Sequence, residues 1–201
     1  MSFLDKLAAS IMPPESAEDR ANARRVAEAC AGQNDWLSTI LQHHQQIEAA
    51  FNEALSATGS DGRLSALKRL GQVLSAHANA EEAVIYPLMT VEDQKAHAAM
   101  AFEEQAAAKT QLALLESIDP MSQEWTDKLE HVMGAVQHHV FKEEGTWFPK
   151  LLQEMPAGES QRVTARFSEE FQRFSGGSAA NDDQFTSRQM AAQATPPSQL
   201  N

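Results

Sequence analysis

The stretch HANAEEAVIYP, residues 77–87, is the most informative part of the chain, because it interrupts an apolar helical stripe with two polar side chains. His77 and Glu81 stand four residues apart, which puts them on one helix face with Cβ atoms about 5 to 6 Å from each other. Leu70 and Leu74 precede them on the same face. The periodicity therefore predicts that a histidine and a glutamate point into the core of a helical protein.

A second stretch, HVFKEEGTWFP at residues 139–149, repeats this pattern. His139 and Glu143 are again four residues apart, and Val136 and Trp147 extend the same face. Both stretches end in an aromatic residue followed by proline, a combination that core packing and the end of a helix explain. The repeat indicates that two helices bring the same pair of side chains into the core.

Helical periodicity extends over most of the chain, and turn signals such as GSDGR and IDPMS divide it. Asp35 is expected to cap the first long helix, and Thr90 to Asp93 resemble a capping box at the start of the third. Short connections make successive helices antiparallel neighbours. The sequence therefore predicts an all-α protein, an up-and-down antiparallel four-helix bundle with helices at about 35–55, 63–88, 90–115 and 122–153.

The length of 201 residues and the hydrophobic content of 42% fit one domain with terminal extensions. Residues 1–34 are expected to form an N-terminal helical extension, whose charged helix ends near Gly32. The bundle occupies residues 35–153, and residues 154–176 form a C-terminal amphipathic helix. Residues 177–201 are rich in Ser, Asn, Gln and Ala, so we expect a disordered tail.

Charge and cysteine content limit the partners and the compartment. The formal net charge of −12 argues against a nucleic-acid or anionic-membrane partner, because phosphate binding relies on Lys and Arg. Cys30 is the single cysteine, which excludes an internal disulfide and a thiolate-rich metal site. The N-terminus lacks the apolar run of a signal peptide, and no segment approaches roughly eighteen apolar residues. We therefore expect a cytoplasmic protein without a membrane span.

The other two helices of the predicted bundle each direct one histidine inward. His44 lies between Leu41 and Ile47 on the first helix, and His97 lies one turn before Met100 on the apolar side of the third. Every helix of the bundle thus contributes one inward histidine, and two helices add a glutamate.

Six such groups in an apolar core indicate a metal site. A buried carboxylate is unfavourable unless it is paired or coordinated, and no Lys or Arg stands at a matching inward position. Imidazole and carboxylate without thiolate suit iron, manganese or zinc and fit calcium poorly. Two six-coordinate metals bridged by both carboxylates would use about eight of roughly twelve positions, which leaves room for a solvent-derived bridge and a small ligand. The candidate metal ligands are His44, His77, Glu81, His97, His139 and Glu143.

Four stretches of the chain resemble, in order, those of the hemerythrin-like or HHE cation-binding family. They are LQHHQQIEAAF, HANAEEAVIYP, KAHAAMAFEEQ and HHVFKEEGTWFP. The resemblance covers about residues 35–153 and places ligands at the same six residues. It implies a non-haem di-iron centre with an oxo or hydroxo bridge, with manganese or zinc as other possible metals.

Two differences from the oxygen-carrying hemerythrins affect the implied function. Ala101 stands one turn after His97, where the carriers have a second histidine. Glu143 stands one residue closer to His139 than the carriers' aspartate does. Fewer imidazoles per carboxylate are expected to favour the ferric state and to admit other ligands. We therefore expect redox sensing, peroxide or nitric-oxide chemistry rather than oxygen transport.

Three classes of function follow, and the first is favoured because the chain shows no second catalytic domain. The protein binds or senses oxygen, nitric oxide or redox state; or it is an oxidoreductase acting on peroxide or nitric oxide, like a peroxidase, catalase or reductase; or it only holds metal. The expected partner is a small diatomic or peroxide ligand. The sequence predicts neither a protein partner nor an oligomeric state.

Several other polar residues adjoin the candidate ligands. Glu48 and Glu104 are expected close enough to the inner faces to hydrogen-bond a ligand imidazole. Tyr86 is expected to pack in the core or to hydrogen-bond near the metals. Residues that point about 100° away from the ligands are expected at the surface, with contact to a ligand as the alternative: His43, His138, Glu82 and Glu144. His131 is expected in solvent.

Overall fold

The structure is a computed structural model that describes residues 15–91, 94–156 and 158–193, with side chains up to residue 176. Every regular element in these residues is a helix and none is a strand, which confirms the all-α prediction. The α-helices are α2 (Ala17–Cys30), α3 (Trp36–Ser56), α4 (Ser60–Ala80), α5 (Tyr86–Val91), α6 (Lys95–Leu114), α7 (Gln123–Lys142), α8 (Phe148–Glu154) and α9 (Glu159–Gln193). A 3-10 turn at Leu115–Ser117 extends α6.

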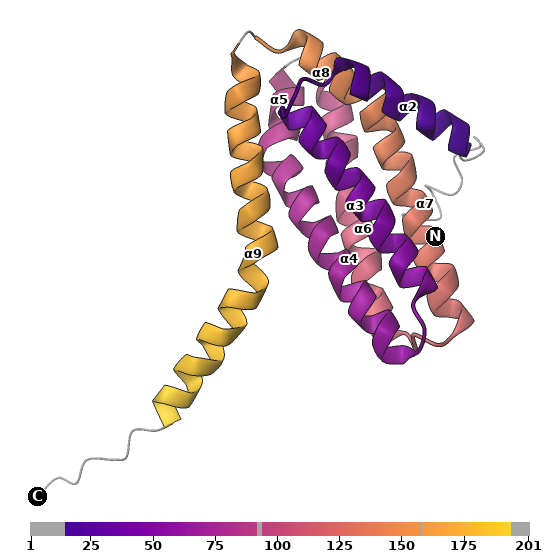
Figure 1. Ribbon diagram of the computed structural model, residues 1–201, viewed down its shortest axis with the longest axis vertical. Coiled ribbons are helices and arrows are strands. Elements are labelled where there is room, and N and C mark those ends of the chain that lie inside the picture. The colour runs from indigo at the N-terminus through magenta and orange to yellow at the C-terminus, as the bar shows by residue number, and fades with distance from the viewer. Residues whose placement is uncertain (1–14, 92–93, 157, 194–201) are drawn as a thin grey trace, which may run out of the picture.

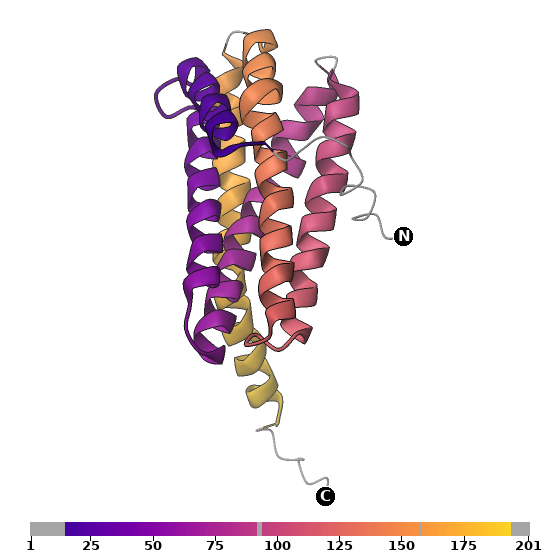
Figure 2. The ribbon, with the colours of Figure 1, turned by 90° about the vertical axis from the view of Figure 1, so that its right-hand side faces the viewer.

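Four long helices, α3, α4, α6 and α7, lie side by side along the long axis of the molecule (Figures 1 and 2). Helix α3 packs against α4 and α7, and α6 packs against the same two helices, so the four enclose a common interior. The predicted cap of α3 is confirmed, because the Asp35 side chain accepts a hydrogen bond of 2.8 Å from the Ser38 amide. Gly59, with φ of 72°, turns the chain between α3 and α4.

The prediction for the start of the third bundle helix is wrong. Thr90 lies inside α5, where its hydroxyl donates to the carbonyl of Pro87, and α6 begins only at Lys95. Residues 92–93 of the expected capping box lie outside the described residues. Met100 is also misplaced, since it is 43% exposed whereas Ala101 is fully buried. The alanine-rich sequence of α6 gives little indication of which face points inward.

The apolar core consists of two clusters separated by a polar layer. One cluster contains Trp36, Leu37, Ile40, Leu41, Trp147 and Phe148, and the other contains Ile47, Phe51, Leu70, Leu74, Leu129 and Val136. His44, His77 and His139 stand on three helices where each crosses from one cluster to the other. The candidate site therefore has apolar packing on both sides along the bundle axis.

Two π-helical turns interrupt the long helices that the sequence predicts over 63–88 and 122–153. They are η1 (Glu81–Ile85) and η3 (Glu143–Trp147), and each begins at a candidate ligand glutamate. The amide of Tyr86 donates to the carbonyl of Glu81, and that of Phe148 donates to the carbonyl of Glu143, five residues back. A proline follows each time, and it has no amide to donate and would clash within an α-helix. The wider turn lets the chain continue helically past the proline.

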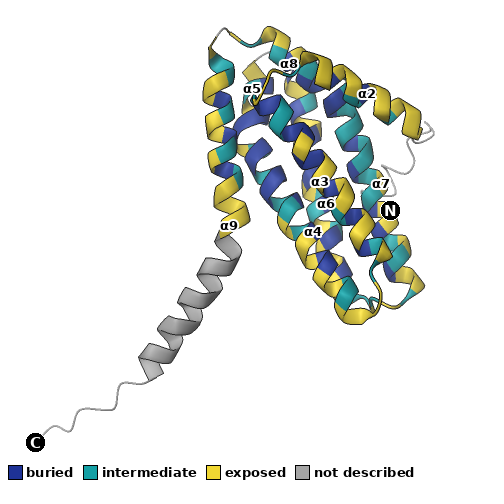
Figure 3. Cartoon of the chain, in the orientation of Figure 1, coloured by how far each residue is buried: buried dark blue, intermediate teal, exposed yellow. Residues whose placement is uncertain are grey.

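Both terminal extensions pack on the bundle. Helix α2 begins with a capping box formed by Ser16 and Asp19 and lies across α3, α7, η3 and α8. Helix α9 runs along α4 and α3 and also contacts η1 (Figure 1). The burial pattern in Figure 3 shows the inward faces of α3 and α4 buried. The division at residues 34, 153 and 176 stays a prediction, as does the disordered tail, since residues 194–201 and the side chains of 177–193 lie outside the description.

None of the helices in the described part of the chain combines the length and the apolar character that crossing a bilayer requires.

Candidate metal centre

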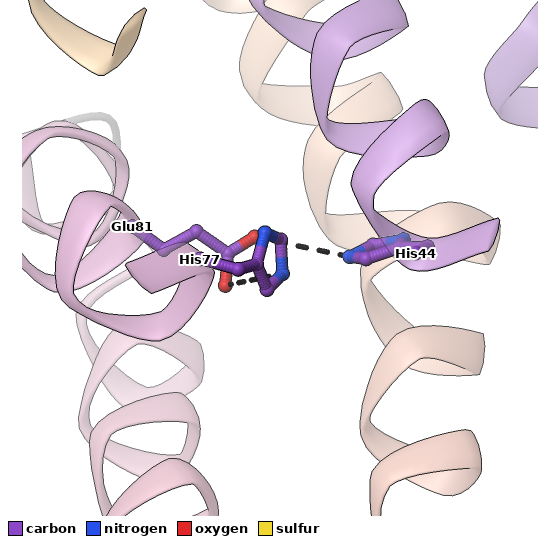
Figure 4. A group of neighbouring side chains, drawn as sticks. All are labelled: His44, His77 and Glu81. Carbon is purple, nitrogen blue, oxygen red and sulfur yellow. Dashed lines mark ion pairs between the residues drawn. The ribbon is translucent and has the colours of Figure 1, made fainter. Parts of the chain in front are cut away.

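Five of the six predicted ligands come together in two buried groups that share one carboxylate. The first group is His44, His77 and Glu81, shown in Figure 4, and the second is Glu81, His139 and Glu143. In each group one nitrogen or oxygen atom per residue lies within 4.8 Å of the others. Helical phase explains the arrangement, because each side chain sits on the apolar stripe of its own helix.

The atoms of the first group approach one another from two helices. His77 Nε2 lies 3.2 Å from Glu81 Oε2, and His44 Nε2 lies 3.9 Å from Glu81 Oε1. His44 Nε2 is also 3.4 Å from Glu143 Oε2, which links the two groups. In the second group, His139 Nε2 lies 3.1 Å from Glu143 Oε1.

Three buried atoms at the centre have no hydrogen-bond partner in the described part of the chain: His44 Nε2, Glu81 Oε1 and Glu143 Oε2. Among the described residues, no Lys or Arg forms an ion pair with either glutamate. A buried group without a partner is unfavourable, and a buried carboxylate more so. The donor set of imidazole nitrogen and carboxylate oxygen therefore fits a bound transition-metal cation.

His97 belongs to neither group of the described residues. Its ring stacks on Trp147, with the centroids 5.2 Å apart and the planes 17° from parallel. Trp147 in turn meets the His139 ring edge to face, at 6.2 Å between centroids. The Nδ1 atom of His97 is buried without a hydrogen-bond partner in the described chain. His97 thus lies beside the second group, one aromatic ring away from it.

Glu144 corrects a sequence prediction, since it is only 2% exposed rather than at the surface. Its Oε1 accepts from His44 Nδ1 at 2.9 Å, and its carboxylate receives three contacts of 3.2 Å from Arg24. It is buried because α2 lies over the turn that carries it. Glu48, expected to contact His44, instead pairs with Arg24 at 3.5 Å and is half exposed.

A matching arrangement holds His139. Glu104 Oε2 lies 2.9 Å from His139 Nδ1, and Lys142 pairs with the other oxygen of the same carboxylate. The predicted contact of Glu104 with the imidazole of a candidate ligand is confirmed, although that imidazole is on α7 and not on its own helix. His44 and His139 therefore both direct Nε2 to the centre while a carboxylate fixes Nδ1.

The remaining predicted neighbours differ in their surroundings. His43 is 7% exposed and stacks on Phe171 at 3.9 Å between ring centroids, because α9 covers it. Its ring also lies 5.8 Å from that of His77, so it contacts a candidate ligand as the alternative interpretation allows.

Glu82 pairs with Lys109 at 2.7 Å near the surface. His138 binds Glu15 from the N-terminal extension, and His131 is exposed as predicted.

Two residues that contact the carboxylates were missed or left open. Gln105, which is 5% exposed, donates from Nε2 to Glu81 Oε2 at 2.5 Å, and nothing in the sequence indicates this contact beyond its position one residue after Glu104. Tyr86 is fully buried, and its hydroxyl lies 2.9 Å from Glu143 Oε1 and 3.1 Å from Glu81 Oε2. The expectation of a hydrogen-bonding role for Tyr86 is confirmed.

Without metal, protons balance the charges of the centre. Burial raises the pKa of Glu81 to about 8, and the neighbouring Glu143 carboxylate adds to the effect. Burial also opposes ionisation of Glu143, but His139 and His44 outweigh it and hold its pKa far below the ordinary value. Burial by itself lowers the pKa of His44, but Glu143 and Glu144 raise it to about 9.

The pKa values of the two remaining imidazoles, His139 and His77, shift in opposite directions. For His139 burial again acts downward, while Glu143 and Glu104 raise its pKa to about 10. Burial and the nearby His44 hold the pKa of His77 well below 6.5. A metal ion would displace protons from Glu81, His44 and His139, so binding should release protons and weaken at low pH.

Comparison with known proteins agrees with this class of site. The model of the hemerythrin HHE cation-binding domain matches residues 36–151, and the chain belongs to this family of helical cation-binding domains. A DNA nickase of Nostoc sp. (strain PCC 7120) is 24% identical over 128 residues, which make up 64% of this chain and 36% of the nickase. The chain thus spans little more than a third of that relative. No solved structure matches.

Proposed function

We propose that this chain is a hemerythrin-like di-iron protein with an up-and-down four-helix bundle, and that it binds a small molecule or senses redox state at the metals. The family and the His/Glu groups support cation binding. The proposed protein ligands are His44, His77, Glu81, His97, His139 and Glu143. The observation that carries the proposal is the convergence of three buried, unpartnered ligand atoms from three helices.

Iron is the proposed metal because its ions accept mixed imidazole and carboxylate ligands and expand to six coordination. When bound, the iron pair would supply a centre that changes oxidation state and offers an open position to an exogenous ligand. The chain's own residues prepare that site. Glu144 and Glu104 hold the imidazoles of His44 and His139, and the two apolar clusters exclude water on either side.

The space beside the centre supports a small ligand. A cavity of about 20 Å³ is lined by His77, His139, Gln105 and the apolar Leu74 and Val136. A cavity of about 10 to 15 Å³ holds one water molecule. A diatomic molecule or peroxide is therefore the proposed ligand class.

Sensing is preferred over turnover because both terminal extensions contact residues next to the ligands. Arg24 of α2 reaches His44 through Glu144, and Phe171 of α9 stacks on His43, which adjoins His77. A change at the metals would thus act on two helices outside the bundle. The second candidate, an oxidoreductase acting on peroxide or nitric oxide, is favoured by the same cavity.

Metal analysis and an absorption spectrum of protein purified under low-zinc conditions test the proposal. We expect two iron ions per chain and the charge-transfer band of an oxo-bridged diferric pair. Glu81→Ala and Glu143→Ala should each lose the two-metal stoichiometry, and His97→Ala tests the sixth ligand in the same assay. A featureless spectrum with one bound zinc would contradict the di-iron assignment, and steady peroxide turnover above that of free iron would favour the enzyme.

We infer that the nickase relative does not bring a nucleic-acid function with it. The shared segment covers only 36% of that protein, and the present chain carries a formal charge of −12, which opposes binding to phosphate. An electrophoretic mobility assay with supercoiled and duplex DNA at low salt tests this inference. Retarded or nicked DNA would overturn it.

A further inference from the structure

The hydroxyl of Tyr86 lies inside the second ligand group rather than beside it. Tyr86 Oη is 2.9 Å from Glu143 Oε1, 3.1 Å from Glu81 Oε2 and 3.2 Å from His139 Nε2. His139 Nε2 is itself 3.1 Å from Glu143 Oε1. A phenol oxygen thus contacts one atom from each of the three proposed ligands of this group.

These spacings also fit atoms that share one metal ion. In octahedral coordination with bonds of about 2.1 Å, adjacent ligand atoms stand about 3.0 Å apart, since the edge is √2 times the bond. The four contacts lie between 2.9 and 3.2 Å. One cation could therefore bind all four atoms with little rearrangement.

Hydrogen bonding alone does not account for the contacts once a metal is present. A phenol has one proton to donate. When a metal has displaced any protons on His139 Nε2 and the two carboxylates into solvent, Tyr86 Oη faces three electron-rich atoms and can donate its proton to only one of them. A shared cation would turn all these contacts into favourable ones.

The two halves of the centre are unequal in a way that a phenolate would correct. Among the five residues that the structure brings together, the first group has two imidazoles, His44 and His77, whereas the second has one, His139, with His97 one aromatic ring away. In the second repeat, the residue equivalent to Tyr86 is Phe148, which has no hydroxyl and instead packs against Trp36 at 5.7 Å. The single hydroxyl at this repeat position therefore points to the half with fewer nitrogen donors.

Local structure fixes the ring in place. Tyr86 is the residue that closes the π turn η1, with its amide bonded to the carbonyl of Glu81, and Pro87 follows it. Phe102 of α6 packs edge to face on the ring, at 5.1 Å between centroids. The position of the hydroxyl is thus set by the same turn that carries one of the glutamates.

We propose that Tyr86 is a metal ligand, whose phenolate oxygen binds the ion held by Glu81, His139 and Glu143. On binding, the phenol O–H bond breaks, an oxygen–metal bond forms, and the proton passes to solvent. The proposal rests on the proposed function, because it needs a metal in the second group.

The experiment is a visible absorption and resonance Raman measurement on the iron-loaded 201-residue chain. A ferric phenolate gives a broad visible band, and excitation in that band enhances tyrosinate ring vibrations. Tyr86 is the single tyrosine of the chain, so such a signal can come from no other residue. The wild-type spectrum is decisive even if a variant fails to fold.

Tyr86→Phe removes one oxygen atom and should abolish the visible band while the iron content stays at the wild-type value. Phe102→Leu is the matched control, because it alters packing on the same ring but keeps the hydroxyl and should keep the band. Two irons per chain without tyrosinate vibrations would overturn the phenolate ligand and leave the proposed function intact. A protein that binds no iron would overturn both.

Discussion

His44 and Glu144 are 100 residues apart in the sequence, yet ring Nδ1 and carboxylate Oε1 lie 2.9 Å apart in the buried interior. Arg24 donates to both oxygens of that carboxylate, so a helix from outside the bundle fixes the orientation of a candidate ligand imidazole. Residues that orient metal ligands in this way contribute to metal affinity without touching the metal.

Replacing Glu144 by Gln should weaken iron binding about 10- to 100-fold, because the neutral amide holds His44 and Arg24 less firmly. Competition with a chelator of known affinity measures the change. Glu82→Gln is the matched control, since Glu82 holds the equivalent repeat position but pairs with Lys109 near the surface. Equal affinities for the two variants would contradict the role of Glu144.

The metal-free protein should lose stability as pH rises from about 6.5 to 10. The folded pKa values of His44 and His139, about 9 and about 10, lie above 6.5, so their contribution is complete below pH 6.5 and is lost as pH rises through those values. Glu81, raised from 4.5 to about 8, acts in the same direction. Denaturant unfolding of chelator-treated protein at several pH values measures the trend.

Zinc-loaded protein is the control for this pH series. Metal then replaces the protons on the same side chains, so its stability should fall less over the same range. His43 and His77 have lowered pKa values, that of His43 being about 4. Their contribution makes stability rise with pH, but only below pH 6.5. Metal-free stability that is constant or rises above pH 6.5 would show that the charges of the centre are arranged differently.

Gly145 and Gly134 should respond differently to alanine. A Cβ at Gly145 would lie 3.3 Å from the Cβ of Ala23 in α2, whereas one at Gly134 meets no described atom within 4 Å. Gly134→Ala should therefore stabilise the protein by about 0.5 to 1 kcal/mol through helix propensity. Gly145→Ala should show no such gain, because α2 must shift, and thermal unfolding separates the two. An equal gain in both variants would mean that α2 packs less closely on η3.

Phe167→Ala should destabilise the protein by about 3 to 5 kcal/mol, because the side chain is fully buried between α9 and the bundle. Phe174, which is 42% exposed on the same helix, is the matched control and should change the free energy of unfolding by less than about 0.5 kcal/mol when replaced by Ala. Urea denaturation followed by tryptophan fluorescence measures both. Similar small effects would indicate that α9 does not dock on α3 and α4.

Helical phase was enough to predict the residues on the inner faces of single helices. His44, His77, Glu81, His139 and Glu143 all follow apolar residues at intervals of three and four, and the structure places all five in the two groups. Their roles as metal ligands remain a prediction. The all-α class and the cap at Asp35 depend on equally local signals.

What the sequence did not reveal depends on contacts between distant segments. Glu144 is buried only because α2 covers it, and His43 only because Phe167 and Phe171 of α9 do. The π turns also escape an analysis that assumes a constant 3.6-residue period, and their presence shifts the phase of Tyr86 relative to the residues before it. Met100 was misplaced because alanines on every face of α6 leave its inner side undefined.

The π turns also carry an evolutionary consequence. Each is an α-helix with one residue added, so if Glu81–Ile85 or Glu143–Trp147 wound as a plain α-helix with no residue lost, everything after it would rotate by about 100°. Tyr86 and Phe148 would leave the core, and each proline would meet a carbonyl it cannot tolerate. The π winding of these two turns should therefore be under stronger selection than the identity of their exposed residues.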